Sequence, residues 1–215
     1  VEIPVEMKDL QNIFARSVGQ LFHQELVEVD KQVLFDLYKE KLGEIITGEV
    51  ENCDKRGASV KLGNSSIYIP RSELIGYEMF EVGDQIRMYV AEASEGKDNK
   101  APALKVTRAN AGFLKVLFEE EVADVRDGTV LIKDVARIAG TRSKVAVYSK
   151  DSNVDPVGSC IGVGGICIKR IVEQLGGKDK EKLDIIPYTT NEALYVANAL
   201  RPGKVVSLCL KGEDE

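Results

Sequence analysis

Five short runs of strand-forming residues follow one another within about 65 residues of the first half of the chain. Turn residues such as Gly57, Gly63-Asn64 and Gly83-Asp84 separate the runs. The predicted strands are residues 45–50, 58–62, 67–70, 85–90 and 103–106. Five strands in so short a stretch match the number in a small OB-type barrel. The sequence therefore predicts a five-stranded OB-type β-barrel over residues 43–111.

The preceding segment, residues 1–42, has a different rhythm. Its apolar residues recur at helical spacing, and Gly19 is the only Gly or Pro between residues 5 and 42. The two apolar stripes comprise Leu10, Ile13, Phe14, Val18, Leu21 and Phe22, and then Val33, Leu34, Leu37, Tyr38 and Leu42. They predict one long helix or a helical hairpin. A segment of this size is too small for a core of its own, so we expect it to pack on the next part of the chain or on a partner.

The last part of the chain, residues 112–215, mixes helix and strand patterns. Asp155-Pro156 is typical of a helix start, because Asp caps the helix and Pro suits its first position. The expected order is a helix at 113–122, strands at 129–136 and 144–148, two short helices around a break at 162–165, a strand at 183–186 and a helix at 191–200. This αββααβ order is an α+β unit. The expected fold class is thus multidomain α+β, with a helical arm, a barrel and this unit.

The break between the two short helices carries the sequence Gly162-Val163-Gly164-Gly165. A dinucleotide fingerprint is excluded, because its third glycine would stand at Cys167 and the turn follows a helix. A P-loop is excluded because no Gly-Lys pair in the chain precedes Ser or Thr. A GxxG turn between helices lets a phosphodiester approach the main chain, facing the amides that open the second helix. The alternative is an ordinary helix–turn–helix connection.

These segments resemble a known family. Residues 154–165, together with 140–148 and 183–186, resemble the first K-homology (KH) domain of the NusA family of bacterial transcription elongation factors. The barrel resembles the RNA-binding S1 domain, with Tyr68-Ile69-Pro70-Arg71-Ser72-Glu73-Leu74 as its signature. The resemblance covers about residues 40–205 and implies a type II KH fold. It also implies binding of nascent transcripts, with residues 1–42 similar to the tail of a polymerase-binding N-terminal domain.

The chain departs from the family pattern in three places. The interior of the GxxG turn is Val163-Gly164, where the family usually has a basic residue. Ser59 stands in the barrel where related modules often have an aromatic residue, which leaves Tyr68 as the main stacking candidate. The family's second KH unit does not follow, so we expect a fragment or an abbreviated member.

The charge of the chain is unevenly distributed. It has 29 Lys and Arg against 35 Asp and Glu, so nucleic-acid binding requires a local basic patch. Residues 137–182 hold an excess of basic over acidic residues around the glycine turn. The predicted RNA-binding residues are Gly162, Val163, Gly164, Gly165, Lys169, Arg170, Arg142, Lys144, Arg137, Tyr68 and Arg71. Lys55, Arg56, Lys61 and Arg108 are weaker candidates, and residues 178–182 are expected to be solvated surface.

The sequence favours a non-enzymatic factor without a metal or cofactor. Its four cysteines form no CxxC pair, and we expect buried thiols in a reducing cytoplasm. His23, the only histidine, has no catalytic motif around it. No stretch approaches the roughly 20 apolar residues of a membrane span, so no membrane association is expected.

The expected function is single-stranded RNA binding that modulates pausing, termination and antitermination. The expected partners are nascent RNA, RNA polymerase and other elongation or antitermination factors, and the chain is expected to be a monomer. Three alternatives stay open. The first is that the chain is the RNA-binding module of an RNA-processing or translation protein. The second is that it is an enzyme that uses Cys160 or Cys167. The third is that it is a protein-interaction scaffold with a degenerate KH site.

Overall fold

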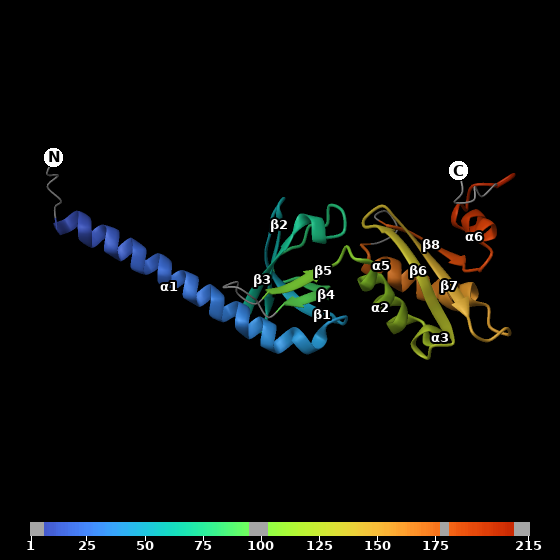
Figure 1. Ribbon diagram of the computed structural model, residues 1–215, viewed down its shortest axis with the longest axis horizontal. Helices are drawn as coiled ribbons and strands as arrows, with labels where there is room; N and C mark the ends of the chain where they lie inside the picture. The colour runs from blue at the N-terminus through green and yellow to red at the C-terminus, as the bar shows by residue number, and fades with distance from the viewer. Residues whose placement is uncertain (1–6, 95–102, 177–180, 209–215) are drawn as a thin grey trace, which may run out of the picture.

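The computed structural model describes residues 7–94, 103–176 and 181–208, without the side chains of residues 7–13 and 16. Three parts follow one another along the long axis of the molecule (Figure 1). A long helix comes first, a curved five-stranded sheet follows, and a mixed helix and strand unit lies at the other end. Among the described helices, none combines the length and apolar character that a bilayer crossing requires.

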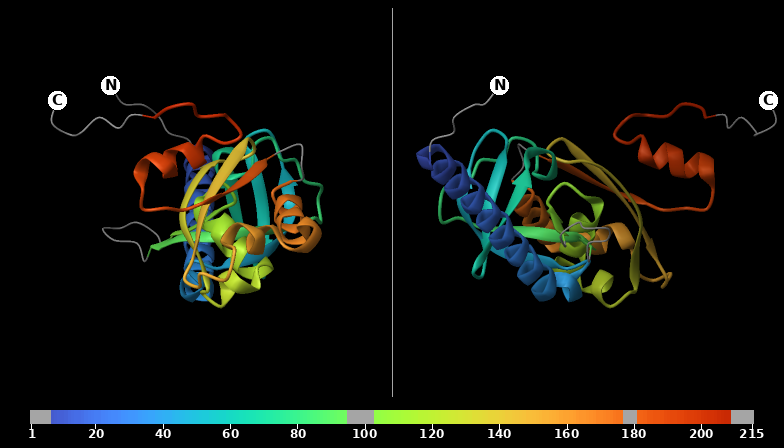
Figure 2. Two further views of the ribbon diagram at one scale, coloured as in Figure 1. Left: turned by 90° about the vertical axis from the view of Figure 1, so that its right-hand side faces the viewer. Right: turned by 60° about the vertical axis from the view of Figure 1, so that its left-hand side comes forward.

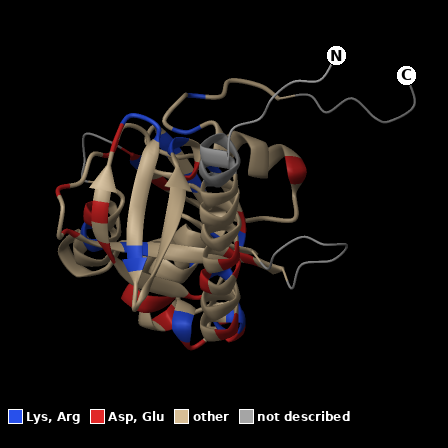
Figure 3. Ribbon diagram, turned by 90° about the vertical axis from the view of Figure 1, so that its left-hand side faces the viewer, with Lys and Arg blue, Asp and Glu red and all other residues tan. Residues whose placement is uncertain are grey.

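The first part is a single helix, α1 (Met7–Tyr38), followed by a short 3-10 turn, η1 (Lys39–Lys41). Of the two sequence-based possibilities, the single helix is therefore correct. Only its last turns pack on the sheet, where Leu34 and Phe35 are buried. Residues 17–24 carry no charged side chain, and charged residues gather in the C-terminal half of the helix (Figure 3). Several apolar side chains beyond the contact are exposed, namely Phe14, Val18, Leu21, Phe22, Leu26, Val29 and Val33.

The second part is an antiparallel sheet with strand order β3-β2-β1-β4-β5. The strands are β1 (Ile45–Cys53), β2 (Gly57–Leu62), β3 (Ser65–Pro70), β4 (Gln85–Ser94) and β5 (Ala103–Thr107), and a 3-10 turn, η2 (Arg71–Glu73), follows β3. Register shifts interrupt β1 between Val50 and Asn52 and β4 between Val90 and Glu92. Such bulges bend strands, and the sheet curls around a buried aliphatic core. The predicted OB-type barrel, nearly closed, is confirmed.

The third part follows the predicted αββααβ order, with one additional short helix, α3. Its helices are α2 (Ala111–Glu121), α3 (Ala123–Arg126), α4 (Pro156–Ile161), α5 (Ile166–Gln174) and α6 (Glu192–Ala199), with a 3-10 turn, η3 (Val163–Gly165), before α5. Its strands are β6 (Val130–Ile138), β7 (Arg142–Ser149) and β8 (Lys182–Pro187). The sheet order is β6-β7-β8, with β6–β7 antiparallel and β7–β8 parallel. The predicted α+β class is confirmed.

The two faces of the β6-β7-β8 sheet have different neighbours. Helices α2 and α5 lie between the barrel and this sheet, whereas α6 lies beyond its other face (Figures 1 and 2). Along β7, Val145 and Val147 belong to the core shared with Phe113, Leu117 and Ile171. Because side chains alternate along a strand, Lys144 and Ala146 face α6 instead. This alternation determines which charged residues lie on the same face of the sheet as the glycine turn.

Two arginines, buried Arg108 and half-buried Arg87, join the barrel to the third part. Arg108, directly after β5, donates from Nε and Nη2 to the Glu78 carboxylate at 3.0 and 2.9 Å, and from Nη2 to the Gln174 carbonyl at 3.0 Å. Beside it, Arg87 of β4 donates from Nη2 to both carboxylate oxygens of Glu120 of α2, at 2.7 Å to Oε1 and 2.6 Å to Oε2. Arg108 is 6% exposed and its guanidinium is paired with Glu78, so we no longer include it among the RNA-binding candidates.

A second contact places the barrel loop after η2 against the β6–β7 turn. A Cβ on Gly140 would lie 2.7 Å from the Gly76 Cα, and both residues have positive φ angles of 75° and 53°. Beneath this turn, the Glu181 carboxylate accepts hydrogen bonds from Arg137, the Gly140 N–H and the Ser143 hydroxyl. Glu181 is 0% exposed, so the expectation that it lies on the solvated surface is wrong. Residues 178–180 of that cluster lie outside the described residues.

Candidate nucleic-acid interface

The predicted glycine turn is an exposed break between α4 and α5. Asp155 caps α4, accepting the Val157 N–H at 3.1 Å, and α4 ends at Gly162. Gly162, Gly164 and Gly165 all have positive φ, of 75°, 63° and 75°, a region that L side chains seldom adopt. No atom lies within 4 Å of a Cβ built on Gly164, and no side chain caps the N-terminus of α5. The backbone is thus open to a ligand at Gly164, whereas the N–H groups of Gly165 and Ile166 already donate to the carbonyls of Gly162 and Val163.

Two adjacent cations on α5 point in different directions. The Lys169 ammonium donates to the Gly164 carbonyl at 3.2 Å, so it folds back onto the turn. Arg170 instead forms an ion pair with Glu121 of α2, at 3.4 Å between Nη1 and Oε2. Val163 is 96% exposed at the tip of the turn and Ile166 is half exposed. The turn therefore combines one nearby cation, Lys169, with an apolar tip.

Arg142 and Lys144 lie on β7, away from the glycine turn. Lys144 faces α6 and donates to the carbonyls of Ala199 and Arg201, with 2.6 Å to the latter. Arg142 pairs with Asp184 of β8, with Nε and Oδ2 3.2 Å apart. The sequence analysis placed these cations beside the turn. Side chains alternate along β7, however, and this alternation directs Lys144 to the face of the sheet that α6 covers. We no longer include Lys144 in the proposed interface.

Arg137 is buried at the junction with the barrel. Its side chain is 2% exposed and donates from Nε and Nη2 to Glu181, at 2.9 and 3.1 Å, and from Nη1 to the Asn110 carbonyl at 2.6 Å. Every group that a phosphate would engage already has a protein partner. We therefore assign Arg137 to the fold and remove it from the proposed interface.

The barrel contributes Tyr68 and Arg71. Tyr68 lies on β3 opposite Ser59 of β2, with its side chain 56% exposed. Arg71, in η2, donates to the Glu78 carbonyl and to Met79 Sδ at 3.3 Å. Its guanidinium also lies 5.9 Å from the centre of the Tyr77 ring. Sequence reasoning did not single out Tyr77, because an aromatic residue in a turn has no periodic partner.

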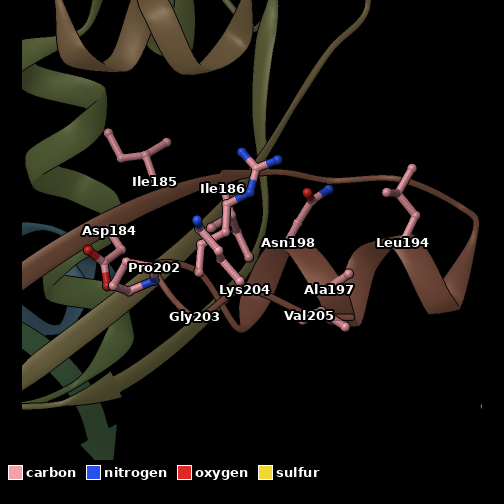
Figure 4. Close-up of a pocket in the computed structure, with 11 residues that line it drawn as sticks. Asp184, Ile185, Ile186, Leu194, Ala197, Asn198, Pro202, Gly203, Lys204 and Val205 are labelled. Carbon is pink, nitrogen blue, oxygen red and sulfur yellow. The ribbon is translucent and has the colours of Figure 1, made fainter. Parts of the chain in front are cut away.

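A cavity of about 780 Å³ lies between β8 and the segment after α6 (Figure 4). Aliphatic residues form most of its wall, including Ile185 and Leu194, while Asp184, Asn198 and Lys204 supply polar groups. Within the described part of the chain, no group of three or more His, Cys, Asp or Glu side chains is arranged to hold a metal ion. We assign no chemistry to this cavity.

The three described cysteines, Cys53, Cys160 and Cys167, are free thiols, and Cys209 lies outside the described residues. The expectation of buried thiols is correct for Cys160 and wrong for Cys53 and Cys167, which are half-buried. Burial raises the pKa of the Cys160 thiol from 9.0 to about 12. We expect native Cys160 to react with iodoacetamide near pH 8 much more slowly than in the denatured chain, because the thiolate is the nucleophile. Between pH 9.0 and about 12 only the unfolded chain ionises this thiol, so stability should fall there as pH rises.

Peptide mapping by mass spectrometry measures this labelling for each cysteine, with half-buried Cys53 and Cys167 as internal comparisons. Rapid native labelling of Cys160 at neutral pH would contradict the burial argument and favour the thiol-enzyme alternative.

Comparison with protein families supports both modules. The family described as "S1 RNA binding domain" matches residues 39–100, and the family described as "NusA-like first KH domain" matches residues 108–188. The first range covers strands β1 to β4 of the curled sheet and the second contains the glycine turn, in the order barrel then KH unit, with β5 lying between the two ranges.

Three relatives that match this chain over almost its whole length have the same name. The chain is 37% identical over 215 residues to the Transcription termination/antitermination protein NusA of Bacillus subtilis, covering 100% of this chain and 57% of the relative. The proteins of that name from Halalkalibacterium halodurans and Thermus thermophilus are also 37% identical, over 100% and 99% of this chain and 55% and 54% of their own lengths. The chain thus spans a little over half the length of these relatives.

Proposed function

This chain is a NusA-like protein in which an S1 domain precedes a NusA-like first KH domain, and from this premise we propose that it binds single-stranded RNA. The observation that carries the proposal is the open glycine turn, with three positive-φ glycines and an uncapped helix behind it. Backbone amides there suit a sugar–phosphate strand, which KH domains clamp at this turn. The proposed contacts are Gly162, Val163, Gly164, Gly165 and Lys169, with Tyr68 and Arg71 on the barrel and Arg142 and Arg170 as secondary cations.

The proposal extends to the setting in which the relatives are named. We propose that the protein acts on transcription termination and antitermination, without enzymatic activity of its own, as a cytoplasmic monomer. RNA polymerase is the proposed protein partner, and the exposed apolar side chains of α1 are the proposed contact. Other elongation factors fit the same setting.

A binding titration tests the RNA proposal. Single-stranded RNA should bind with an affinity that falls as salt rises, with a slope of log K against log salt of about −0.7 for each phosphate contacted. Single-stranded DNA of the same sequence and an RNA duplex serve as comparisons. Absence of RNA binding at low salt, or binding that salt does not change, would contradict phosphate recognition.

One observation favours a second function. Val163, 96% exposed, is an apolar residue in the interior of a turn where the KH pattern of the family usually includes a basic residue. Without that cation the turn lacks one point charge for a phosphate, which leaves protein interaction as the alternative role. If RNA does not bind, and a Val163→Lys variant gains RNA affinity that the parent chain lacks, the scaffold function is favoured.

The orientations of Lys169 and Arg170 predict unequal effects on RNA affinity. Lys169→Ala should weaken RNA binding about 5- to 10-fold and reduce the salt slope by about 0.7, because one cation leaves the phosphate path. Arg170→Ala should change the affinity less than about 2-fold, because that guanidinium already faces Glu121. Fluorescence anisotropy with labelled RNA measures both variants. Equal losses would show that the turn does not select between the two cations.

A further inference from the structure

Tyr77 lies exposed on a turn between two buried residues, Ile75 and Glu78. Its side chain is 90% exposed, whereas Ile75 and Glu78 beside it are 0% and 3% exposed. The Ile75 N–H donates to Glu78 Oε2 at 3.1 Å, and Arg108 holds the same carboxylate in a buried pair. The backbone under the ring is thereby fixed. An aromatic side chain on a fixed backbone loses less conformational freedom when a flat ligand stacks on it than one on a mobile loop.

A cation accompanies the ring. The Arg71 Cζ lies 5.9 Å from the Tyr77 ring centre, and contacts with the Glu78 carbonyl and Met79 Sδ hold the guanidinium in place. An aromatic ring beside an arginine is the pairing that non-specific single-strand binders use, where the ring stacks on a base and the cation meets the phosphate.

The ring also stands where the two modules meet. Tyr77 directly follows Gly76, whose backbone contacts Gly140 in the β6–β7 turn. On the far side of that contact, the N–H of exposed Lys182 donates to the Thr141 carbonyl at 3.0 Å. Each module thus has a cation near the contact: Arg71 beside Tyr77 in the barrel, and exposed Lys182 of the KH unit, whose backbone bonds next to Gly140.

We propose that Tyr77 is a base-stacking residue that guides an RNA strand from the barrel to the KH unit. The proposal rests on the function proposed above and adds a site outside the glycine turn. The cations favour a polyanion as the ligand over an apolar protein surface. A strand long enough to touch both modules has to pass their junction, so Tyr77 should matter for long RNAs and not for short ones.

RNA length separates the two sites. Tyr77→Ala should weaken binding of an RNA of about 16 nucleotides by about 5- to 100-fold, the range expected for one stacked base. It should not change binding of an RNA of about 4 nucleotides, the number that a KH turn clamps. Tyr77→Phe keeps the ring and should restore the affinity. The melting temperature should be unchanged, since the ring is exposed.

A spectroscopic variant tests stacking directly. The chain contains no Trp, so Tyr77→Trp introduces a single reporter whose fluorescence should be quenched by the long RNA. Phe22→Trp, on the exposed part of α1, is the matched control and should not be quenched.

The outcomes are distinct. If the parent chain binds RNA but Tyr77→Ala binds the long RNA equally well, or Tyr77→Trp is not quenched, the inference is wrong while the proposed function stands. If the parent chain binds neither RNA, the proposed function fails and this inference fails with it. A length-dependent loss, restored by Phe, supports both.

Discussion

Replacing Glu181 by Gln should lower the free energy of unfolding by about 3–5 kcal/mol, the cost of leaving a buried charge without its partner. Glu181 is fully buried and accepts from Arg137, Ser143 and the Gly140 N–H. A glutamine amide turns one acceptor oxygen into a donor and leaves the Arg137 guanidinium uncompensated. Urea denaturation followed by circular dichroism measures the change.

Two further variants make this prediction specific to the buried pair. Glu173→Gln, at an exposed position on α5, changes the same chemistry and should shift stability by less than about 0.5 kcal/mol. Replacing Arg137 and Glu181 together by Met removes both charges and should recover part of the loss. Equal stability of Glu181→Gln and Glu173→Gln would show that the carboxylate does not hold the junction.

Replacing Gly164 and Gly165 together by Asp should weaken single-stranded RNA binding by about 10- to 100-fold. The loss corresponds to one or two charge-assisted contacts replaced by repulsion between carboxylates and phosphates. The turn should be strained, because both residues have positive φ, but the fold should survive: Cβ atoms at these positions meet no atom closer than 3.8 Å, and Asp and Asn are the L residues that best tolerate a left-handed backbone. Anisotropy titration and the far-ultraviolet spectrum measure binding and folding separately.

The matched control replaces the same two glycines by Asn. Asn has the size and backbone tolerance of Asp but no charge, so RNA affinity should stay within about 3-fold of the parent chain. If Asn weakens binding as much as Asp does, then close approach to the bare backbone matters more than charge. If neither weakens binding, the strand does not run over this turn.

Local sequence patterns were sufficient to predict the strands, the main helices and their order, but not the short helix α3. Periodicity separated α1 from the strands, and Asp155-Pro156 marked the start of α4. The glycines of the turn were predicted to be open, and the positive φ angles explain why that residue type stands there. Patterns of this kind depend on neighbours within a few residues, which a sequence displays directly.

The roles of the charged residues depended on tertiary contacts. Arg137, Arg108 and Glu181 look like surface residues in the sequence, yet their partners lie 30 to 44 residues away and bury them. Lys144 and Lys169 have the same side chain and lie in the same basic region of the sequence. Lys144 nevertheless faces α6, whereas Lys169 faces the glycine turn.

The sequence by itself determined the helical arm, the barrel, the KH unit and the place of the glycine turn, because backbone preferences and apolar periodicity are local. Only the tertiary structure decided which cations are free to meet a ligand and that Gly76 and Gly140 bring Tyr77 to the junction. A charge is available only where no distant partner desolvates or neutralises it, and distant partners are a property of the fold.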